Sequence, residues 1–172
     1  MERGAGVIGP GYVSMMARYN RWQNESIYNA SETLADEARR QDLGAFFGSI
    51  HATLSHLAWG DATWMSRFTD RPAPGGRIAE STSLHSVWEE LKAERRALDA
   101  DILAWADRVD DGWLASELSW YSGAAGRQVT RPAAALVVHF FNHQTHHRGQ
   151  VHAMLTRCGA RPGDTDLFLM EP

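Results

Sequence analysis

Apolar residues recur at helical spacing in four long stretches of the chain and predict four amphipathic helices. The first begins near Tyr12 and runs through "YVSMMARYNRWQNESIYNAS". The second, "LGAFFGSIHATLSHLAWGDATWMSRF", follows Asp42, which is a plausible N-cap residue. Its apolar positions at helical spacing are Phe46, Phe47, Ile50, Leu54, Leu57, Met65 and Phe68.

Turn-forming residues separate the later helices. "TDRPAPGGRIAESTS" is expected to be a loop, and Ser83 is expected to cap a third helix from Leu84 to about Arg108. A fourth helix starts at Thr130 and Pro132 and ends near Cys158, with Gly159 as its stop.

Two segments depart from helical periodicity. "LASELSWYSGAAGRQVT" predicts an extended or hairpin-like insertion around Gly123 and Gly126. The tail "DTDLFLMEP" is expected to pack Leu167, Phe168 and Leu169 on the helices. Four long helices with little strand predict an all-α four-helix bundle, with residues 1–11 as a flexible lead-in and residues 12–172 as one domain.

The composition narrows the function classes. A net charge of −4 gives no electrostatic support for binding nucleic acid, so no nucleic-acid partner is expected. No stretch approaches the ~20 continuous apolar residues of a membrane span, and no secretory signal is visible. Cys158 is the single cysteine, which rules out an intrachain disulfide and fits a reducing compartment. The cytoplasm is the expected location.

Residues 139–155, "HFFNHQTHHRGQVHAML", hold five of the eight histidines of the chain. At ~100° per residue, His143 and His147 share one stripe of the helix with apolar residues and therefore point inward. Their i, i+4 spacing lets both imidazoles reach one cation. A third ligand has to come from elsewhere, and the second helix offers His51 and His56. A hydrogen-bonded pair in the core is the alternative, and the spacing alone leaves the two interpretations open.

Three segments carry a resemblance to a known family: "NHQTHHRGQVHAML", "GSIHATLSHLAWGDATWMSRF" and "ARYNRWQNESIYNAS". They resemble the last, second and first helices of the DinB/YfiT-like metalloprotein superfamily, in its damage-inducible DinB branch. The resemblance implies a four-helix bundle of up-down-down-up type, often dimeric. It also implies one divalent metal ion, usually zinc or nickel, held by His56, His143 and His147.

An open site with three histidine ligands is typical of catalytic metal centres, because structural zinc is usually closed by four protein ligands. Such a centre can activate a bound water or a thiolate. Iron or manganese could occupy the same set of nitrogens. Some relatives in the superfamily depend on a low-molecular-weight thiol, so such a thiol is a candidate cosubstrate. The sequence names no catalytic group beyond the metal-bound water or thiolate.

Weaker candidates surround the predicted centre. Asp61 could orient a ligand histidine, but structural pairing with Arg18 or Arg148 is the favoured interpretation. Gln150 could hydrogen-bond a metal-bound water or be a satisfied core amide. The remaining candidates for the pocket are His146, Asn20 with Asn24, and Asn142, the last of these by the family pattern.

The sequence thus predicts a metal-dependent enzyme that acts on a small molecule, of the thiol S-transferase or hydrolase type. The alternative is a non-enzymatic metal-binding or ligand-binding stress-response protein, because no clear general acid or base accompanies the motifs. A homodimer is expected from the family resemblance alone.

Overall fold

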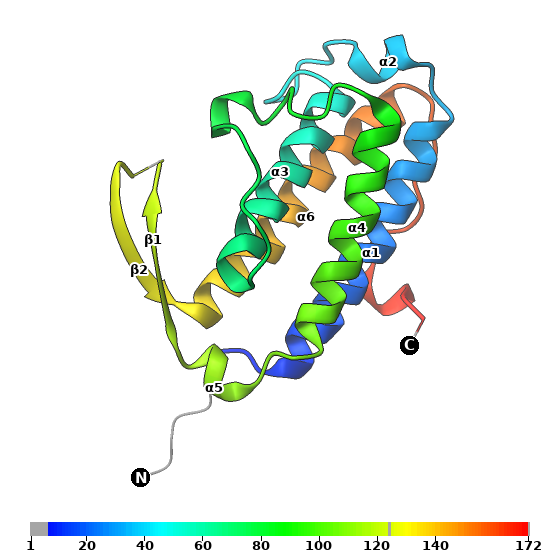
Figure 1. The fold of residues 1–172 in the computed structure, drawn as a ribbon. Coiled ribbons are helices and arrows are strands. Elements are labelled where there is room, and N and C mark those ends of the chain that lie inside the picture. The colour runs from blue at the N-terminus through cyan, green and yellow to red at the C-terminus, as the bar shows by residue number, and fades with distance from the viewer. Residues whose placement is uncertain (1–6, 124, 172) are drawn as a thin grey trace.

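The computed structural model describes residues 7–123 and 125–171 and is mostly helical, with one small sheet (Figure 1). Four long helices form its body: α1 (Pro10–Glu32), α3 (Ile50–Phe68), α4 (Trp88–Ala106) and α6 (Ala133–Arg157). Two short helices, α2 (Asp36–Arg40) and α5 (Asp111–Leu114), lie in the connections. Single 3₁₀ turns occupy Ile78–Glu80 and Leu167–Leu169.

The four long helices pack as a ring in which α1 and α3 each contact both α4 and α6 (Figure 1). Their apolar stripes meet in two clusters of buried side chains. One cluster includes Leu54, Leu98 and Leu155, and the other is rich in aromatic rings and includes Phe140. The predicted helical bundle is therefore observed, and it places α3 and α6 side by side.

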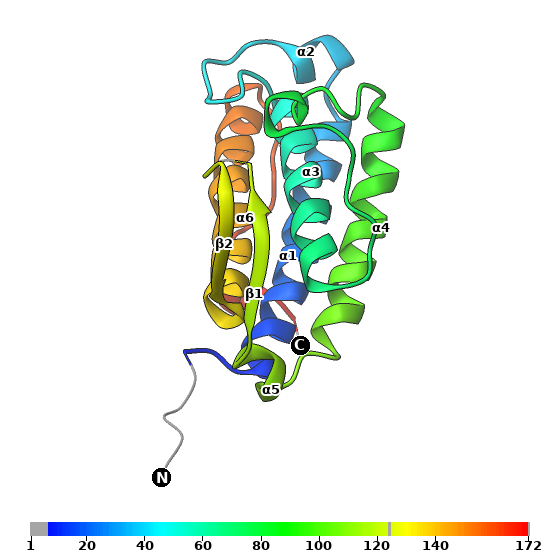
Figure 2. The same cartoon turned by 60° about the vertical axis from the view of Figure 1, so that its left-hand side comes forward.

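A two-stranded antiparallel sheet, β1 (Glu117–Ser122) and β2 (Arg127–Pro132), interrupts the helices as the sequence predicted. The predicted start of the last helix is wrong, because Thr130 and Pro132 belong to β2 and α6 begins at Ala133. Trp120 pairs with Val129 in this hairpin. Figure 2 shows the hairpin standing on the outside of the bundle, where β2 leads directly into α6. Because Trp120 packs on Trp64, with ring centroids 5.6 Å apart, the hairpin is fastened to α3 as well.

The predicted start of the second helix is wrong. Helix α3 begins at Ile50, and its N-cap is Ser49, whose hydroxyl accepts from the backbone N–H of Ala52 at 3.1 Å. Gly44 and Gly48 lie at φ +74° and +77°, a left-handed conformation that an α-helix does not admit. Residues 41–49 therefore form a tight loop, and Phe46 is 81% exposed instead of buried in the core.

The third helix also starts later than predicted, at Trp88, so Ser83 is not its cap. Hydrogen bonds to α3 hold the preceding loop away from helical geometry. The Ser55 hydroxyl donates to the Ser81 carbonyl at 2.8 Å, and His51 bonds the carbonyl of His85 at 2.7 Å. Such long-range bonds satisfy the backbone groups of the loop without a helix.

The tail does not pack its apolar side chains as expected. Phe168 is 83% exposed. The segment before it is fixed through backbone groups instead, because Tyr19 donates to the Thr165 carbonyl at 2.7 Å and the Gly163 N–H donates to Ser26 at 2.8 Å. Helix α1 begins at Pro10, two residues before its predicted start, and residues 1–6 of the predicted lead-in lie outside the described residues. No helix of the described residues has the length and apolarity needed to cross a membrane.

Candidate metal centre

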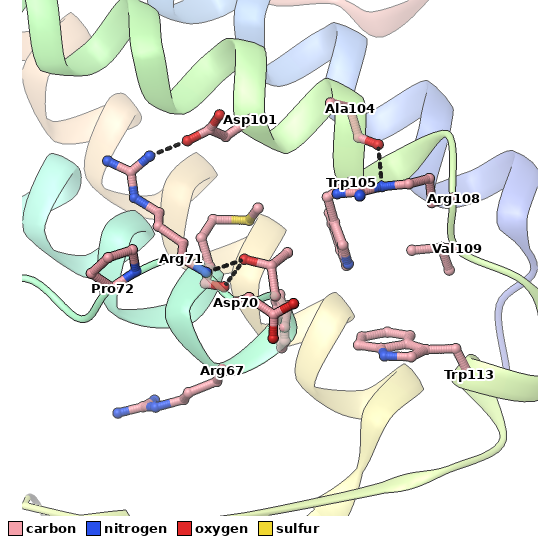
Figure 3. Close-up of a pocket in the computed structure, with 13 residues that line it drawn as sticks. Arg67, Asp70, Arg71, Pro72, Asp101, Ala104, Trp105, Arg108, Val109 and Trp113 are labelled. Carbon is pink, nitrogen blue, oxygen red and sulfur yellow. Dashed lines mark hydrogen bonds and ion pairs between the residues drawn. The ribbon is translucent and has the colours of Figure 1, made fainter.

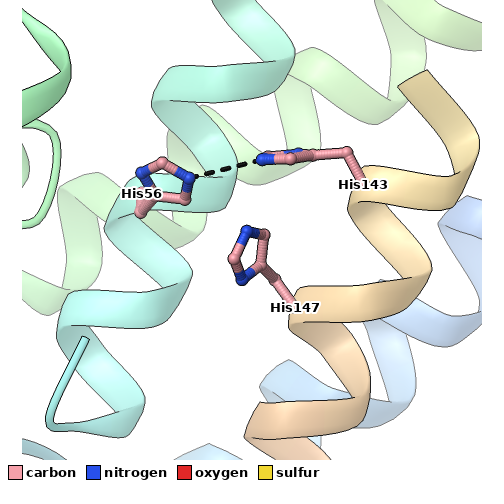
Figure 4. Close-up of side chains that lie close together, drawn as sticks. All are labelled: His56, His143 and His147. Atoms are coloured by element: carbon pink, nitrogen blue, oxygen red, sulfur yellow. Dashed lines mark hydrogen bonds between the residues drawn. The ribbon is translucent and has the colours of Figure 1, made fainter. Parts of the chain in front are cut away.

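Three imidazoles converge between α3 and α6 (Figure 4). His56 lies on α3, and His143 and His147 lie on α6. One ring nitrogen of each lies within 4.8 Å of those of the other two. The Nε2 atoms of His56 and His143 are 3.3 Å apart. With metal–nitrogen bonds of about 2.0–2.1 Å, two ligands of a tetrahedral zinc ion stand at nearly this separation. The donor set can therefore hold a metal ion.

Local sequence explains how the rings reach one another. His143 and His147 are one turn apart on α6, and their ring centroids are 4.5 Å apart. The facing position on α3 is Gly60, where an added Cβ would lie 3.1 Å from Cε1 of His143. This glycine leaves the space that the His143 ring occupies, so the absence of a side chain at residue 60 is part of the site.

A buried serine fixes the tautomer of His56. The hydroxyl of Ser81 lies 2.8 Å from His56 Nδ1 and donates its own hydrogen to the Ile78 carbonyl at 2.7 Å. Ser81 can then only accept from His56, so the proton of the neutral imidazole sits on Nδ1. The lone pair of Nε2 is left facing His143, which is the tautomer that a metal ligand needs.

Gln150 gives His147 the same support. Its Oε1 lies 2.8 Å from His147 Nδ1, and its amide nitrogen lies 3.4 Å from Nε2 of His146. An amide oxygen only accepts, so Nδ1 of His147 carries the hydrogen and Nε2 is free to bind a cation. Gln150 thus holds a ligand ring. The exposed His146 contacts Gln150 and also packs edge-on against His147, with ring centroids 4.9 Å apart.

Burial keeps these imidazoles neutral. It lowers the pKa of His56 to about 3 and that of His143 to about 4. At His143 the charge of Asp61 opposes this shift, and the neighbouring histidines add smaller downward contributions to the pKa at both rings. Burial also lowers the pKa of His147. At neutral pH each of the three rings is therefore uncharged and keeps one nitrogen with a free lone pair, as metal coordination requires.

Phe47 covers the centre from the loop before α3. Its ring centroid lies 4.1 Å from that of His56 and 5.3 Å from that of His147. The neighbouring Phe46 stacks edge-on against it at 4.8 Å and projects into solvent. The aromatic cover lowers the local dielectric around the nitrogens and borders the space that a further ligand would occupy.

Within the described residues, no hydrogen bond joins Asp61 to the three histidines, although its charge acts on His143. Asp61 forms a buried ion pair with Arg95 of α4 at 2.6 Å, so the expected structural pairing is correct but the expected partners, Arg18 and Arg148, are wrong. Arg95 also pairs with Asp99 at 3.0 Å. The partner was not evident from the sequence because Arg95 lies on another helix, 34 positions away.

Asn20 and Asn24 belong to the same buried network and not to the mouth of the site. Both donate to Asp99, at 3.3 and 2.8 Å, and Asn20 accepts from Arg148. Burial lowers the pKa of Arg148 to about 10. Through Asn20, the positive charge of Arg148 helps to balance the negative charge of Asp99. The network joins α1, α3, α4 and α6.

The remaining candidates lie outside the centre. Asn142 is exposed on α6, and His51 is buried against the loop that precedes α4. Sequence reasoning missed Ser81, Gly60 and Phe47. For Gly60 the only available signal was its position one turn after His56 on the same helix. Ser81 and Phe47 lie in loops, whose positions depend on the tertiary structure.

Comparison with known proteins places the chain in a family. The model of the DinB family matches residues 9–172. The protein named Protein DinB from Bacillus subtilis (strain 168) is 28% identical over 156 residues, which cover 88% of this chain and 88% of that protein.

Proposed function

The chain belongs to the DinB family, and from this premise we propose that His56, His143 and His147 bind one divalent metal ion in a metal-dependent enzyme that acts on a small molecule. The observation that carries the proposal is the tautomer pattern: Ser81 and Gln150 each accept an Nδ1 hydrogen, and the freed Nε2 atoms converge. Histidines that bind a metal almost always donate their other ring N–H to such a partner, which fixes the tautomer and the orientation of the ring.

Zinc or nickel is the proposed ion, and iron and manganese suit the same donors less well. When bound by three neutral imidazoles, the ion supplies a Lewis-acidic centre with an open coordination position. The chain contributes orientation of the ligands through Ser81 and Gln150 and exclusion of water by Phe47. This arrangement favours chemistry in which a small nucleophile, a low-molecular-weight thiol or water, is brought to a substrate. We therefore propose an S-transferase or a hydrolase.

Metal analysis tests the first step. Purified protein is expected to hold close to one equivalent of metal by mass spectrometry, and His143→Ala is expected to lose it. His152→Ala, on the same helix but outside the cluster, is the matched control and is expected to keep its metal. Metal-free wild-type protein that also fails to take up added zinc or nickel would contradict the proposal.

A second candidate is a non-enzymatic metal-binding or ligand-binding stress-response protein. One observation favours it: within the described residues, Ser81 and Gln150 are the groups outside the cluster that hydrogen-bond the three imidazoles, and neither titrates near neutral pH. A panel of low-molecular-weight thiols with model electrophiles separates the two candidates. Metal-loaded protein that accelerates no thiol transfer and no hydrolysis would favour the second.

The rest of the proposal concerns assembly and context. We propose an up-down-down-up order of the long helices, supported by the course of α1, α3, α4 and α6 in Figure 1. We also propose a homodimer, to be tested by light scattering. The partner is a small molecule and not nucleic acid or membrane, in line with the net charge of −4, and the free thiol of Cys158 suits the cytoplasm.

A further inference from the structure

A row of aromatic and basic side chains leads away from the metal centre toward the C-terminal end of α3. His143 is followed by His139, with ring centroids 6.1 Å apart, and His139 by Trp64 at 5.1 Å. The guanidinium of Arg67 lies 4.4 Å from the Trp64 ring. Arg67 also stands 5.2 Å from the ring of Trp120 in the hairpin.

Helix geometry puts the two ends of this row on one face. Arg67 follows His56 by eleven positions on α3, which is close to three complete turns, so both residues point the same way. The rise between their backbone positions is about 16 Å. Gly60 and Trp64 occupy the intervening turns of that face.

The charge of Arg67 has no partner in the described part of the chain. The ion pairs there are formed by other basic residues, among them Arg71, which binds Glu94 at 2.7 Å and also contacts Asp101. Arg67 rests on two indole rings instead. An arginine held over aromatic faces keeps its in-plane N–H groups available, and those groups form a fork that matches a carboxylate.

We propose that Arg67 is the anchor for a carboxylate on an elongated small molecule whose other end reaches the three-histidine centre. Trp64 and Trp120 hold the guanidinium in place, and His139 lies between the anchor and the centre. This inference rests on the proposed metal site, and it adds a substrate class to it: an acid with a metal-binding head and a spacer of up to about 16 Å.

The large cavity beside Arg67 is a competing position for an anion. It measures about 950 Å³ and lies between the end of α3, α4 and α5 (Figure 3). Figure 3 shows the guanidinium of Arg67 directed away from Trp105 and Trp113, which border this cavity. Its lining includes the carboxylates of Asp70 and Asp101 and the guanidinium groups of Arg67, Arg71 and Arg108, so charge alone does not exclude an anion there. Arg108 lines it too and donates from Nε to the Ala104 carbonyl, so Arg108 is a matched control.

The test uses the full chain loaded with Co²⁺, whose visible spectrum changes when a thiolate enters its coordination sphere. The ligands are ω-mercaptoalkanoates of increasing chain length, each compared with its neutral carboxamide. The carboxylate is expected to bind about tenfold more tightly than the carboxamide at one preferred length. Arg67→Gln is expected to remove this preference, and Arg108→Gln is expected to retain it.

The outcomes separate this inference from the function it rests on. Equal affinity of the wild type for carboxylates and carboxamides at every length would overturn the role of Arg67 while leaving the metal site intact. If Arg108→Gln lost the preference for carboxylates and Arg67→Gln kept it, the anion would bind in the cavity. That result would also overturn the role of Arg67. Failure of the wild type to bind Co²⁺, or to admit any thiol, would overturn the proposed function together with the inference.

Discussion

His56 and Ser81 are joined by a 2.8 Å hydrogen bond across 25 positions of the chain, and this bond decides which nitrogen of the imidazole faces the centre. The serine hydroxyl is buried and already committed to donate to Ile78. A side chain in a loop therefore sets the protonation pattern of a ligand on a helix.

Replacing Ser81 with alanine is expected to weaken metal binding by about 10- to 100-fold, because Nδ1 of His56 loses the acceptor that orients the ring. Competition with a chromophoric chelator measures the affinity. Ser83→Ala in the same loop is the control, since the Ser83 hydroxyl bonds only the Glu80 carbonyl in the described structure. Equal affinities in the two variants would show that the hydrogen bond does not tune the site.

Gly60→Ala is expected to weaken metal binding without unfolding the protein. The new methyl group would stand 3.1 Å from His143 Cε1, so the ring has to move away from its partners. Gly149→Ala on α6 is the control, because nothing lies within 4 Å of a methyl group there. That control is expected to keep its affinity and to gain up to about 1 kcal/mol of stability from helix propensity. Chelator competition and urea unfolding measure the two effects, and an unchanged affinity in Gly60→Ala would contradict the steric argument.

Arg95→Leu is expected to destabilise the fold by about 3–5 kcal/mol, because Asp61 would remain buried without its ion-pair partner and Asp99 would lose its direct one. Lys92→Leu, one turn earlier on α4, breaks ion pairs with the half-exposed Glu32 and the exposed Glu89. Its expected cost is below about 1 kcal/mol. Urea unfolding of both variants gives the comparison. A similar, small loss in each would mean that the buried network contributes little.

The stability of the metal-free protein is expected to fall as the pH drops from about 7 to 4. In the unfolded chain the histidines titrate near 6.5, whereas burial lowers the pKa of His56 to about 3 and of His143 to about 4 in the fold. The unfolded state therefore takes up protons first, and acid favours it.

Urea unfolding at a series of pH values measures this slope. The double variant His56→Asn/His143→Asn lacks both groups and is expected to show a shallower dependence over the same range. Parallel curves for the wild type and the double variant would locate the acid sensitivity elsewhere, for example in the buried carboxylates.

The sequence predicted the helices and the inward-facing histidine pair because both are recorded in local spacing. A 3.6-residue apolar period identifies a helix wherever it falls, and it also turns His143 and His147 toward the core. The hairpin was predicted on similar grounds, from its glycines and the loss of the helical period. The resemblance to the DinB family then singled out His56 from His51.

What the sequence by itself determined is thus the set of helices and the inward direction of the histidine pair. Only the tertiary structure decided that Phe47 lies in a loop over the rings, that Ser81 orients His56, and that Asp61 pairs with Arg95. Each of these contacts joins residues from different elements of the chain. No period within a helix encodes such a contact, because it exists only after the helices have packed and the loops between them have found their hydrogen-bond partners.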